Sequence, residues 1–455
     1  MQAIIQYLRQ NGYQTVDESF YSHINLWFKW YKGKVASFHG YRQYNGRKKI
    51  SRERKTLGMA KKVPEDWANL ELNERVEIVV NDETLNKTIQ QILMDNNFWV
   101  RGNQLLEIAY ALGTGAIVEY QDGDSIKMDY IRAGMIYPLR WDNGEIIDCA
   151  FASERVNGKN KLVYLNIHEL VGDSYRIRNQ MFVRDGNHLN PTELPEEVVS
   201  EINTGSPIPL FQIIKPNIAN NIDPDSPMGV SVYANAIDQL EGLDLVYDSY
   251  CNEFRLGKKR VIVPDTMAKM MMEADGSVTP MFDDNDLEFF ALNLGNDAEP
   301  QLQEINMELR SEAHEAALKT ALNLLSTKCG LGNDRFNFEH GNLKTATEVV
   351  SEKSELFQNL RKHELILEKA LTDMVKAILF LLGEEVDVEI TINFDDSIII
   401  DQEAERMRFL QEIRDGVRQK WEYRVRYLGE DEATAKKMAG GNMSDEQLMF
   451  GGGDA

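Results

Sequence analysis

An uninterrupted helical pattern over residues 345–383 constrains this chain more than any other feature of its sequence. Thr345 and Glu348 have the spacing of an N-terminal capping box, and Gly383 stands where a C-capping glycine belongs. Apolar side chains recur mostly every three or four positions and so share one helix face: Val349, Leu356, Leu360, Leu367, Leu371, Met374, Ile378 and Leu382. Such a helix is on the order of 55 Å long, so its apolar stripe needs lateral partners.

A membrane span is a poor explanation for this helix. Charged residues interrupt its most apolar part, at Glu364, Glu368, Lys369, Asp373 and Lys376. An ordinary coiled-coil hairpin remains an alternative use for such a helix.

Composition indicates a soluble, globular chain. Its 455 residues are enough for two to four domains, and 43% of them are hydrophobic and 27% charged. The first twenty residues lack the basic and apolar regions of a signal peptide. The three cysteines, Cys149, Cys251 and Cys329, lie far apart, which predicts free thiols rather than a disulfide framework or a zinc site.

The formal net charge of −23 argues against DNA binding through simple neutralisation of phosphates. It leaves open a surface past which DNA slides without sticking. Residues 42–62 are an exception, because they hold nine basic residues and one acid, Glu53. This stretch is interpreted as a solvated, partly mobile loop, with a contact to an acidic partner or nucleic acid as the alternative.

The first half of the chain predicts helices followed by an antiparallel sheet. Two consecutive helices are predicted, the first starting at Asp82 or Thr84 and the second ending near Gly113. Strands then follow at about 115–185, with hairpin signals at Asp122-Gly123 and Asn143-Gly144. The next segment is predicted to be loops because it is polar and carries four prolines, Pro191, Pro195, Pro207 and Pro209.

The second half predicts long helices around a small insertion. One helix is expected to open at Ser226-Pro227 and end at Gly257, and another to run up to Gly330. A strand over 259–264 and a small unit rich in Met and Asp lie between them. After the long helix, strict alternation predicts a half-buried strand at 386–394. Shorter helices are expected at 401–415, 418–428 and 431–438, followed by a disordered tail at 441–455.

A search for catalytic, nucleotide and metal motifs gives no positive support for any of them. The glycines before Lys344-Thr345 do not form a phosphate loop, because Asn342 and Leu343 separate them from the lysine. His314-Glu315 and His363-Glu364 lack the second histidine of a zinc protease and are interpreted as helix-surface residues.

Two acidic clusters are open to a second interpretation. Asp283, Asp284 and Asp286 could bind a divalent cation, but an exposed acidic turn is favoured because the glycine and distal glutamate of a calcium loop are missing. Asp395-Asp396 is interpreted as a strand-to-helix turn rather than as an acid/base pair. The sequence predicts no catalytic residue, no cofactor and no metal.

Three separated stretches resemble the portal proteins of tailed bacteriophages, particularly those of long-tailed phages that infect Gram-positive bacteria. They occur in the expected order: RLGKKRVIVPDTMAK, KTATEVVSEKSELFQNLRKHE and ITINFDDSIIIDQEAERMRFLQEI. Two N-terminal stretches, LGMAKKVPEDWANLELNE and PLRWDNGEIIDCAF, are similar to the wing of that family. The resemblance covers most of the chain.

This resemblance implies an α+β portal fold with an α/β wing, a two-helix stem, a small α/β clip, a long tunnel helix and an α-helical crown. It implies the following segments: 1–225 for most of the wing, 226–257 for the wing-to-stem helix, 258–304 for the clip, 305–330 for the second stem helix, 331–344 for a tunnel loop, 345–383 for the tunnel helix, 384–400 for a strand returning to the wing, 401–440 for the crown and 441–455 for the tail.

The resemblance also implies a function and partners. Such a protein forms a ring, typically of twelve copies, at one capsid vertex, through which double-stranded DNA is packaged, retained and ejected. Its partners are the terminase large subunit, a head-tail adaptor, the major capsid and scaffolding proteins, and DNA held without sequence specificity. It belongs to the virion, is assembled in the host bacterial cytoplasm, involves no membrane and has no catalytic activity of its own.

Site residues follow from the same resemblance. Five residues are expected to face the DNA channel: Asp334, Arg335, Phe336, Asn337 and Lys344. Basic residues at the boundary of stem and clip, Lys258, Lys259 and Arg260, are expected to touch DNA or to pair with a neighbouring copy. The alternative to a portal is a non-catalytic oligomeric interaction protein built on coiled-coil helices.

Overall fold

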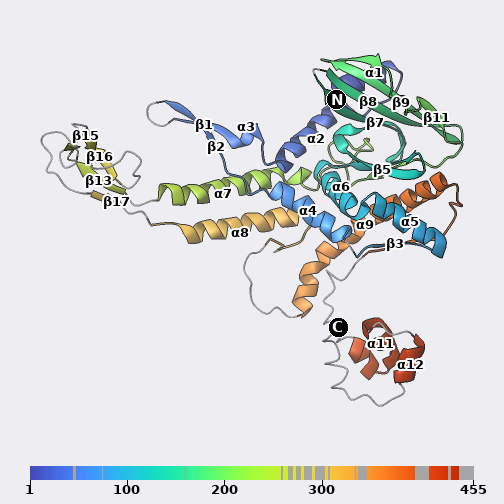
Figure 1. The fold of residues 1–455 in the computed structure, drawn as a ribbon. Coiled ribbons are helices and arrows are strands. Elements are labelled where there is room, and N and C mark those ends of the chain that lie inside the picture. Colours follow the sequence, from blue (N-terminus) through green and yellow to red (C-terminus); the bar gives the residue numbers. More distant parts are fainter. Residues whose placement is uncertain are drawn as a thin grey trace. The chain divides into compact units, whose positions relative to one another are not determined.

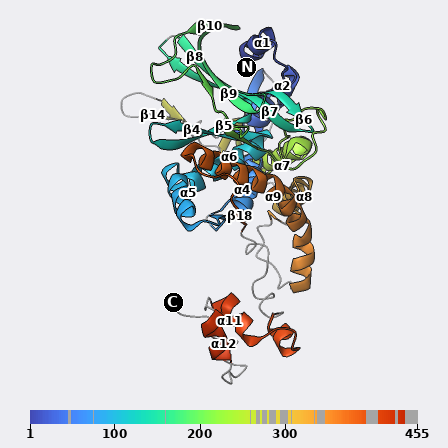
Figure 2. The ribbon, with the colours of Figure 1, turned by 90° about the vertical axis from the view of Figure 1, so that its right-hand side faces the viewer.

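The structure is a computed structural model that describes most of the chain in two compact units (Figures 1 and 2). The described residues are 1–44, 48–73, 75–158, 160–257, 260–264, 270–272, 278–280, 289–292, 303–305, 308–333, 335–336, 346–394, 409–428 and 432–439. One unit comprises Met1–His340 and Asn359–Asn393, and the other Gly341–Gln358 and Phe394–Ala455. The described chain contains helices and mostly antiparallel sheets, so the predicted α+β class is confirmed.

Six helices form most of the N-terminal part: α1 (Gln2–Gln10), α2 (Glu18–Tyr31), α3 (Ala36–His39), α4 (Met59–Glu71), α5 (Glu83–Asp95) and α6 (Phe98–Leu112). The Asp82 side chain caps α5 by accepting hydrogen bonds from the amides of Thr84 and Leu85. Gly113 ends α6 with a φ of 88°. The two helices predicted between Asp82 and Gly113 are therefore confirmed.

Two antiparallel sheets follow. The first has the order β12 (Phe211–Ile214), β4 (Gly115–Asp122), β5 (Ser125–Arg132). The second is six-stranded and consists of β6 (Ile136–Asp142), β7 (Glu145–Asn157), β8 (Asn160–Val171), β9 (Ser174–Asp185) and β10 (His188–Thr192), with β11 (Glu201–Asn203) also paired to β9. Asn143 and Gly144 both have positive φ, as a two-residue hairpin loop requires, so that predicted turn is confirmed.

The two sheets share an aromatic core. The Phe211 ring on β12 lies 5.5 Å from Phe151 on β7 and 5.4 Å from His168 on β8, centroid to centroid. In Figures 1 and 2 the three-stranded sheet lies between the six-stranded sheet and helices α5 and α6. This layered body positions the helices described below.

The prediction of loops after residue 185 was partly wrong, because β10, β11 and β12 lie in that stretch. Pro191 is part of β10, opposite Phe182 of β9. A proline cannot donate a ladder hydrogen bond, and β10 is the terminal strand of the sheet's path, where that loss is tolerated. Proline content alone therefore did not identify a loop.

The predicted helix start at Ser226-Pro227 was also wrong. Helix α7 covers Ile237–Leu256 and is preceded by a single 3-10 turn, η2 (Ala234–Ala236). Backbone amides before that point bond outside the segment: Gly229 to the Thr114 hydroxyl at 3.0 Å and Val232 to the Tyr110 carbonyl at 3.0 Å. These tertiary bonds replace helical ones. The predicted end at Gly257 is confirmed.

Helix α8 (Ser311–Lys328) packs against α7 in the opposite direction (Figure 1). Between them in the chain, β13 (Arg260–Pro264) pairs in parallel with β16 (Phe289–Leu292) and antiparallel with β17 (Gln303–Ile305). A separate hairpin joins β14 (Met270–Met272) to β15 (Val278–Pro280). The strand predicted over 259–264 is confirmed, whereas the acidic turn at Asp283, Asp284 and Asp286 lies outside the described residues.

The long helix is confirmed as α9 (Ala346–Leu382). Leu360, Leu371 and Met374 of its apolar stripe are fully buried, whereas Leu382 is 37% exposed. At its end the amide of Gly383 bonds to the carbonyl of Phe380 and that of Glu384 to Leu379, which is a Schellman motif with Gly383 at a φ of 75°. The predicted capping box lies outside the described residues at Thr345.

The strand predicted at 386–394 is confirmed in a shorter form. β18 (Ile390–Asn393) pairs antiparallel with β3 (Glu77–Val80), and Ile392 is buried between exposed neighbours. Residues 409–414, α11 (Lys420–Leu428) and α12 (Glu432–Ala439) are helical. The predicted tail and Asp395-Asp396 lie outside the described residues.

The basic stretch contains a β-hairpin where a loop was predicted. β1 (Gly40–Tyr44) and β2 (Lys49–Glu53) pair antiparallel, with Tyr44 opposite Lys49. Almost every residue of both strands is exposed, so the solvated character predicted for the stretch is confirmed for the hairpin. Met59 and Ala60, at the far end of the stretch, are buried in α4.

Candidate DNA channel segment and stem

The segment predicted to line a channel begins where α8 ends. Gly330 has a φ of 78°, its amide bonds to the Thr327 carbonyl, and the Leu331 amide bonds to the Ser326 carbonyl. This is a second Schellman motif, built in the same way as the one that ends α9. The buried Ser326 hydroxyl then donates to the Gly332 carbonyl at 2.6 Å, which fixes the first residues of the segment.

One side chain from α4 and one from α9 donate hydrogen bonds to the backbone at the end of α8. Trp67 on α4 donates its indole N–H to the Cys329 carbonyl at 3.2 Å. Asn359 on α9 donates to the Gly330 carbonyl at 2.9 Å. Both acceptors are carbonyls just past the end of α8, where no further helical amide follows to bond to them. The segment therefore begins from a clamped position.

Two of the five residues predicted to face a channel are described. Arg335 approaches Asp66 on α4, with its Nε 3.4 Å from Oδ2, and Lys62 contacts the other oxygen of Asp66 at 2.5 Å. Phe336 is only 8% exposed, which argues against a channel-facing side chain at this position. Asp334, Asn337 and Lys344 lie outside the described residues.

A buried polar cluster that sequence reasoning missed adjoins Trp67. The His363 ring packs edge-on against Trp67, with centroids 4.8 Å apart, and its Nδ1 accepts a hydrogen bond from the Asn217 amide at 2.9 Å. Burial lowers the pKa of His363 to about 4, so it is neutral at physiological pH. Tyr110 donates to the buried Glu71 carboxyl at 2.5 Å, and burial raises the pKa of Glu71 well above its ordinary value.

The interpretation of His363-Glu364 as a surface pair was wrong, because each residue is only 4% exposed. His363 lies three residues after Leu360 and four before Leu367, both of which belong to the buried stripe. That spacing was a usable signal for burial.

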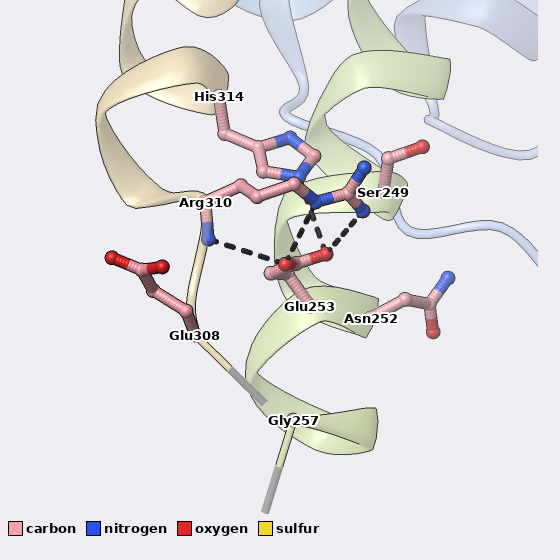
Figure 3. A pocket seen from close by; sticks show the side chains of 7 residues that line it. All are labelled: Ser249, Asn252, Glu253, Gly257, Glu308, Arg310 and His314. Carbon is pink, nitrogen blue, oxygen red and sulfur yellow. Dashed lines mark hydrogen bonds and ion pairs between the residues drawn. The ribbon is translucent and has the colours of Figure 1, made fainter. Parts of the chain in front are cut away.

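Where α7 ends and α8 begins, Arg310, just before α8, and His314, in its first turn, contact Glu253 of α7 (Figure 3). Arg310 makes two contacts with the Glu253 carboxylate, 2.7 Å from Nη2 to Oε2 and 3.0 Å from Nε to Oε1. The Arg310 backbone amide also donates to Oε1 at 3.2 Å, and His314 lies 3.6 Å from Oε2. These hydrogen bonds lower the pKa of Glu253 to about 2.

This cluster ties the end of α7 to the start of α8, where the chain passes to and from the β13 to β17 region. A Cβ on Gly257 would lie 2.4 Å from the Leu309 side chain, so the chains approach closely here. Two of the predicted boundary residues, Lys258 and Lys259, lie outside the described residues. Arg260 is the first residue of β13 and pairs with Ile305 in the backbone ladder.

The possible metal ligands in the described part of the chain are not gathered into a site. No cluster of three or more His, Cys, Asp or Glu residues is placed to hold a metal there. All three cysteines are free, as predicted, and burial raises the pKa of Cys329 to about 12. None of the described helices combines the length and apolar character needed to cross a membrane.

Comparison with protein families gives one match over most of the sequence. The family model described as phage portal protein, SPP1 Gp6-like, matches residues 11–420 of the 455. A comparison with curated proteins gives no match. The family match covers the layered body, both antiparallel helices, the clamped segment and the long helix, and the chain therefore belongs to the phage portal proteins, the structural components of head–tail connectors.

Proposed function

We propose that copies of this chain assemble into a ring, typically of twelve, around a channel that conducts double-stranded DNA at one capsid vertex. The pair of helices α7 and α8 carries this proposal. Large apolar side chains on the pair remain exposed in the single subunit: Leu245 at 49%, Phe254 at 42% and Leu324 at 59%. Exposed apolar residues on a projecting helix pair favour lateral burial against neighbours, which a ring of identical copies supplies.

Segment assignments follow the family. The pair α7 and α8 would form the stem, β13 to β17 would lie in the clip, residues 331–344 would face the channel, α9 would be the tunnel helix, and the helices after residue 400 would form the crown. Clamping of the segment at Gly330 supports its role, because a loop that meets moving DNA needs a fixed base. Asp334, Asn337 and Lys344 are the proposed channel residues, and Arg335 reaches the channel only if it releases Asp66.

The net charge of −23 suits a channel wall that repels phosphates and so avoids deep binding wells while DNA moves. The clip would meet the terminase large subunit during packaging and the head-tail adaptor afterwards. The wing and crown would meet the major capsid and scaffolding proteins. The ring would be built in the host bacterial cytoplasm and remain at the portal vertex of the virion.

The same model assigns no catalytic role to the chain, so the packaging ATPase would be the terminase. A coiled-coil interaction protein is disfavoured, because the family match includes the two antiparallel sheets, which such a protein does not need.

Deletion of residues 333–342 tests the channel assignment. The base of the segment is held by contacts at Cys329 and Gly330, outside the deletion, so rings should still assemble. Packaging of DNA in infected cells should fail, as measured by the DNA content of purified heads. Normal packaging by the deleted protein would remove these residues from the channel.

A further inference from the structure

The hairpin of β1 and β2, here called the basic ribbon (40–53), is left uncovered by the described part of its own subunit. Its strands are exposed on both faces, and Tyr44 is 65% exposed. A two-stranded ribbon without a covering element is at best marginally stable in water. A partner that packs against it is therefore expected.

The ribbon is nevertheless held firmly at its base. Asp248 of α7 accepts a hydrogen bond from the Lys55 amide at 3.0 Å, and Asp244 accepts one from the Leu57 amide at 2.8 Å. His39, just before β1, contacts the other oxygen of Asp244 at 3.1 Å, and both of these side chains are buried. The Arg54 guanidinium lies over the Tyr41 ring, 4.8 Å from its centroid. These contacts fix the base of the ribbon to helix α7.

The cationic side chains of the ribbon indicate the kind of surface that binds it. Lys61 and Lys62, farther along the basic stretch, form ion pairs with acids of their own subunit. Arg42, Lys49 and Arg52, on the ribbon itself, form none with any described residue of that subunit. These three cations remain available for a partner.

A matching set of carboxylates lies at the start of α8. Glu308, Glu312 and Glu315 are exposed and have no ion-pair partner within the described chain. Glu312 and Glu315 share a helix face with the small exposed residue Ala316, which leaves room for a strand to approach. No ion pair joins these acids to the ribbon within the described subunit.

We propose that the basic ribbon of one subunit docks on the start of α8 in the next copy of this chain, pairing Arg42 and Lys49, which the strand register places on one face of the ribbon, with Glu312 and Glu315. Each copy carries both surfaces, so the contact is heterologous and can repeat around a ring. This inference rests on the proposed ring. It adds an arm by which each subunit holds its neighbour.

Zero-length carbodiimide coupling of the unaltered protein tests the contact without any substitution. Rings are formed from a mixture of ¹⁵N-labelled and unlabelled protein, coupled, digested and analysed by mass spectrometry. We expect Lys49 to be joined to the peptide containing Glu312 and Glu315, with one heavy and one light partner. Links from Lys49 only within one copy, or only to other acids, would overturn the proposal.

Charge reversal supplies the second test. Arg42→Glu with Lys49→Glu, both on the same face of the ribbon, should raise the protein concentration needed for half-maximal ring assembly about tenfold, or about 1.4 kcal/mol. Adding Glu312→Arg and Glu315→Arg to the same chain should restore assembly, while the control Lys161→Glu, at an exposed position of β8, should have no effect. Circular dichroism of each variant monitors folding.

The outcomes separate this contact from the ring itself. Absence of rings in the unaltered protein would refute the proposed function. Rings that assemble equally well after charge reversal, or a loss that the second pair of substitutions does not restore, would overturn the ribbon contact alone. Normal rings with weaker binding to duplex DNA would assign the ribbon to DNA instead.

Discussion

Replacing Gly330 with alanine should loosen the base of the proposed channel segment, residues 331–344. Gly330 has a φ of 78°, and a left-handed conformation costs a residue with a Cβ about 1–2 kcal/mol. The new Cβ would lie 3.1 Å from the Asn359 amide nitrogen, so this side chain must move and weaken its 2.9 Å hydrogen bond to the Gly330 carbonyl. Losing that bond adds about 1 kcal/mol, for a total of about 2–3 kcal/mol.

Gly383→Ala is the matched control. Gly383 occupies the same Schellman position at the end of α9, with a φ of 75°, but a Cβ there meets nothing within 4 Å. It should therefore cost only the backbone strain. The difference between the two variants, about 1 kcal/mol, measures the contribution of the Asn359 contact.

Hydrogen exchange read by mass spectrometry provides the assay. The amides of Gly330 and Leu331 bond to the carbonyls of Thr327 and Ser326, so their protection reports the clamp directly. A local loss of about 2 kcal/mol should accelerate their exchange roughly thirtyfold in Gly330→Ala. Equal acceleration at the two helix ends in their respective variants would refute a special clamp at Gly330.

Substitutions at three further positions test other parts of the structure. Glu119 is fully buried with no hydrogen-bond partner for its carboxyl among the described residues, and burial raises its pKa, so the folded state keeps a proton that the unfolded state loses. Glu119 should therefore lower stability by about 1.4 kcal/mol per pH unit between its unfolded pKa and its raised folded pKa, and Glu119→Gln should remove this contribution to the pH dependence of thermal melts. Tyr110→Phe should cost about 1–3 kcal/mol in the same melts, because it strands the buried Glu71 carboxyl, and an unchanged melt would contradict that pairing. Arg310→Ala should return the pKa of Glu253 from about 2 toward its ordinary value in an NMR titration, and Arg310→Lys should do so in part because lysine lacks the two-pronged geometry.

Local signals explain what the sequence predicted well. The Asp82 cap, the Asn143-Gly144 turn and the terminal glycines at 330 and 383 each act within a few residues of themselves. The stripe on the long helix was readable for the same reason, because its period is a property of the helix. Portal membership, in turn, was suggested by separated motifs in the right order and is shown by the family match over residues 11–420.

Features that depend on distant parts of the chain were not predictable. The start of α7 is set by a close approach in which a Cβ on Gly229 would lie 2.2 Å from the Gly113 carbonyl oxygen, and the two glycines are far apart in sequence. Arg335 and Asp66 meet across a separation of 269 residues. No periodic pattern encodes either contact, so the channel segment's base became visible only in the fold.

Imaging of the purified protein by electron microscopy tests the central claim most directly. We expect closed rings, each with a central hole wide enough for a DNA duplex, and with wing and stem arranged around one axis. Particles that remain single subunits, dimers or rods at every protein concentration and salt condition would contradict it.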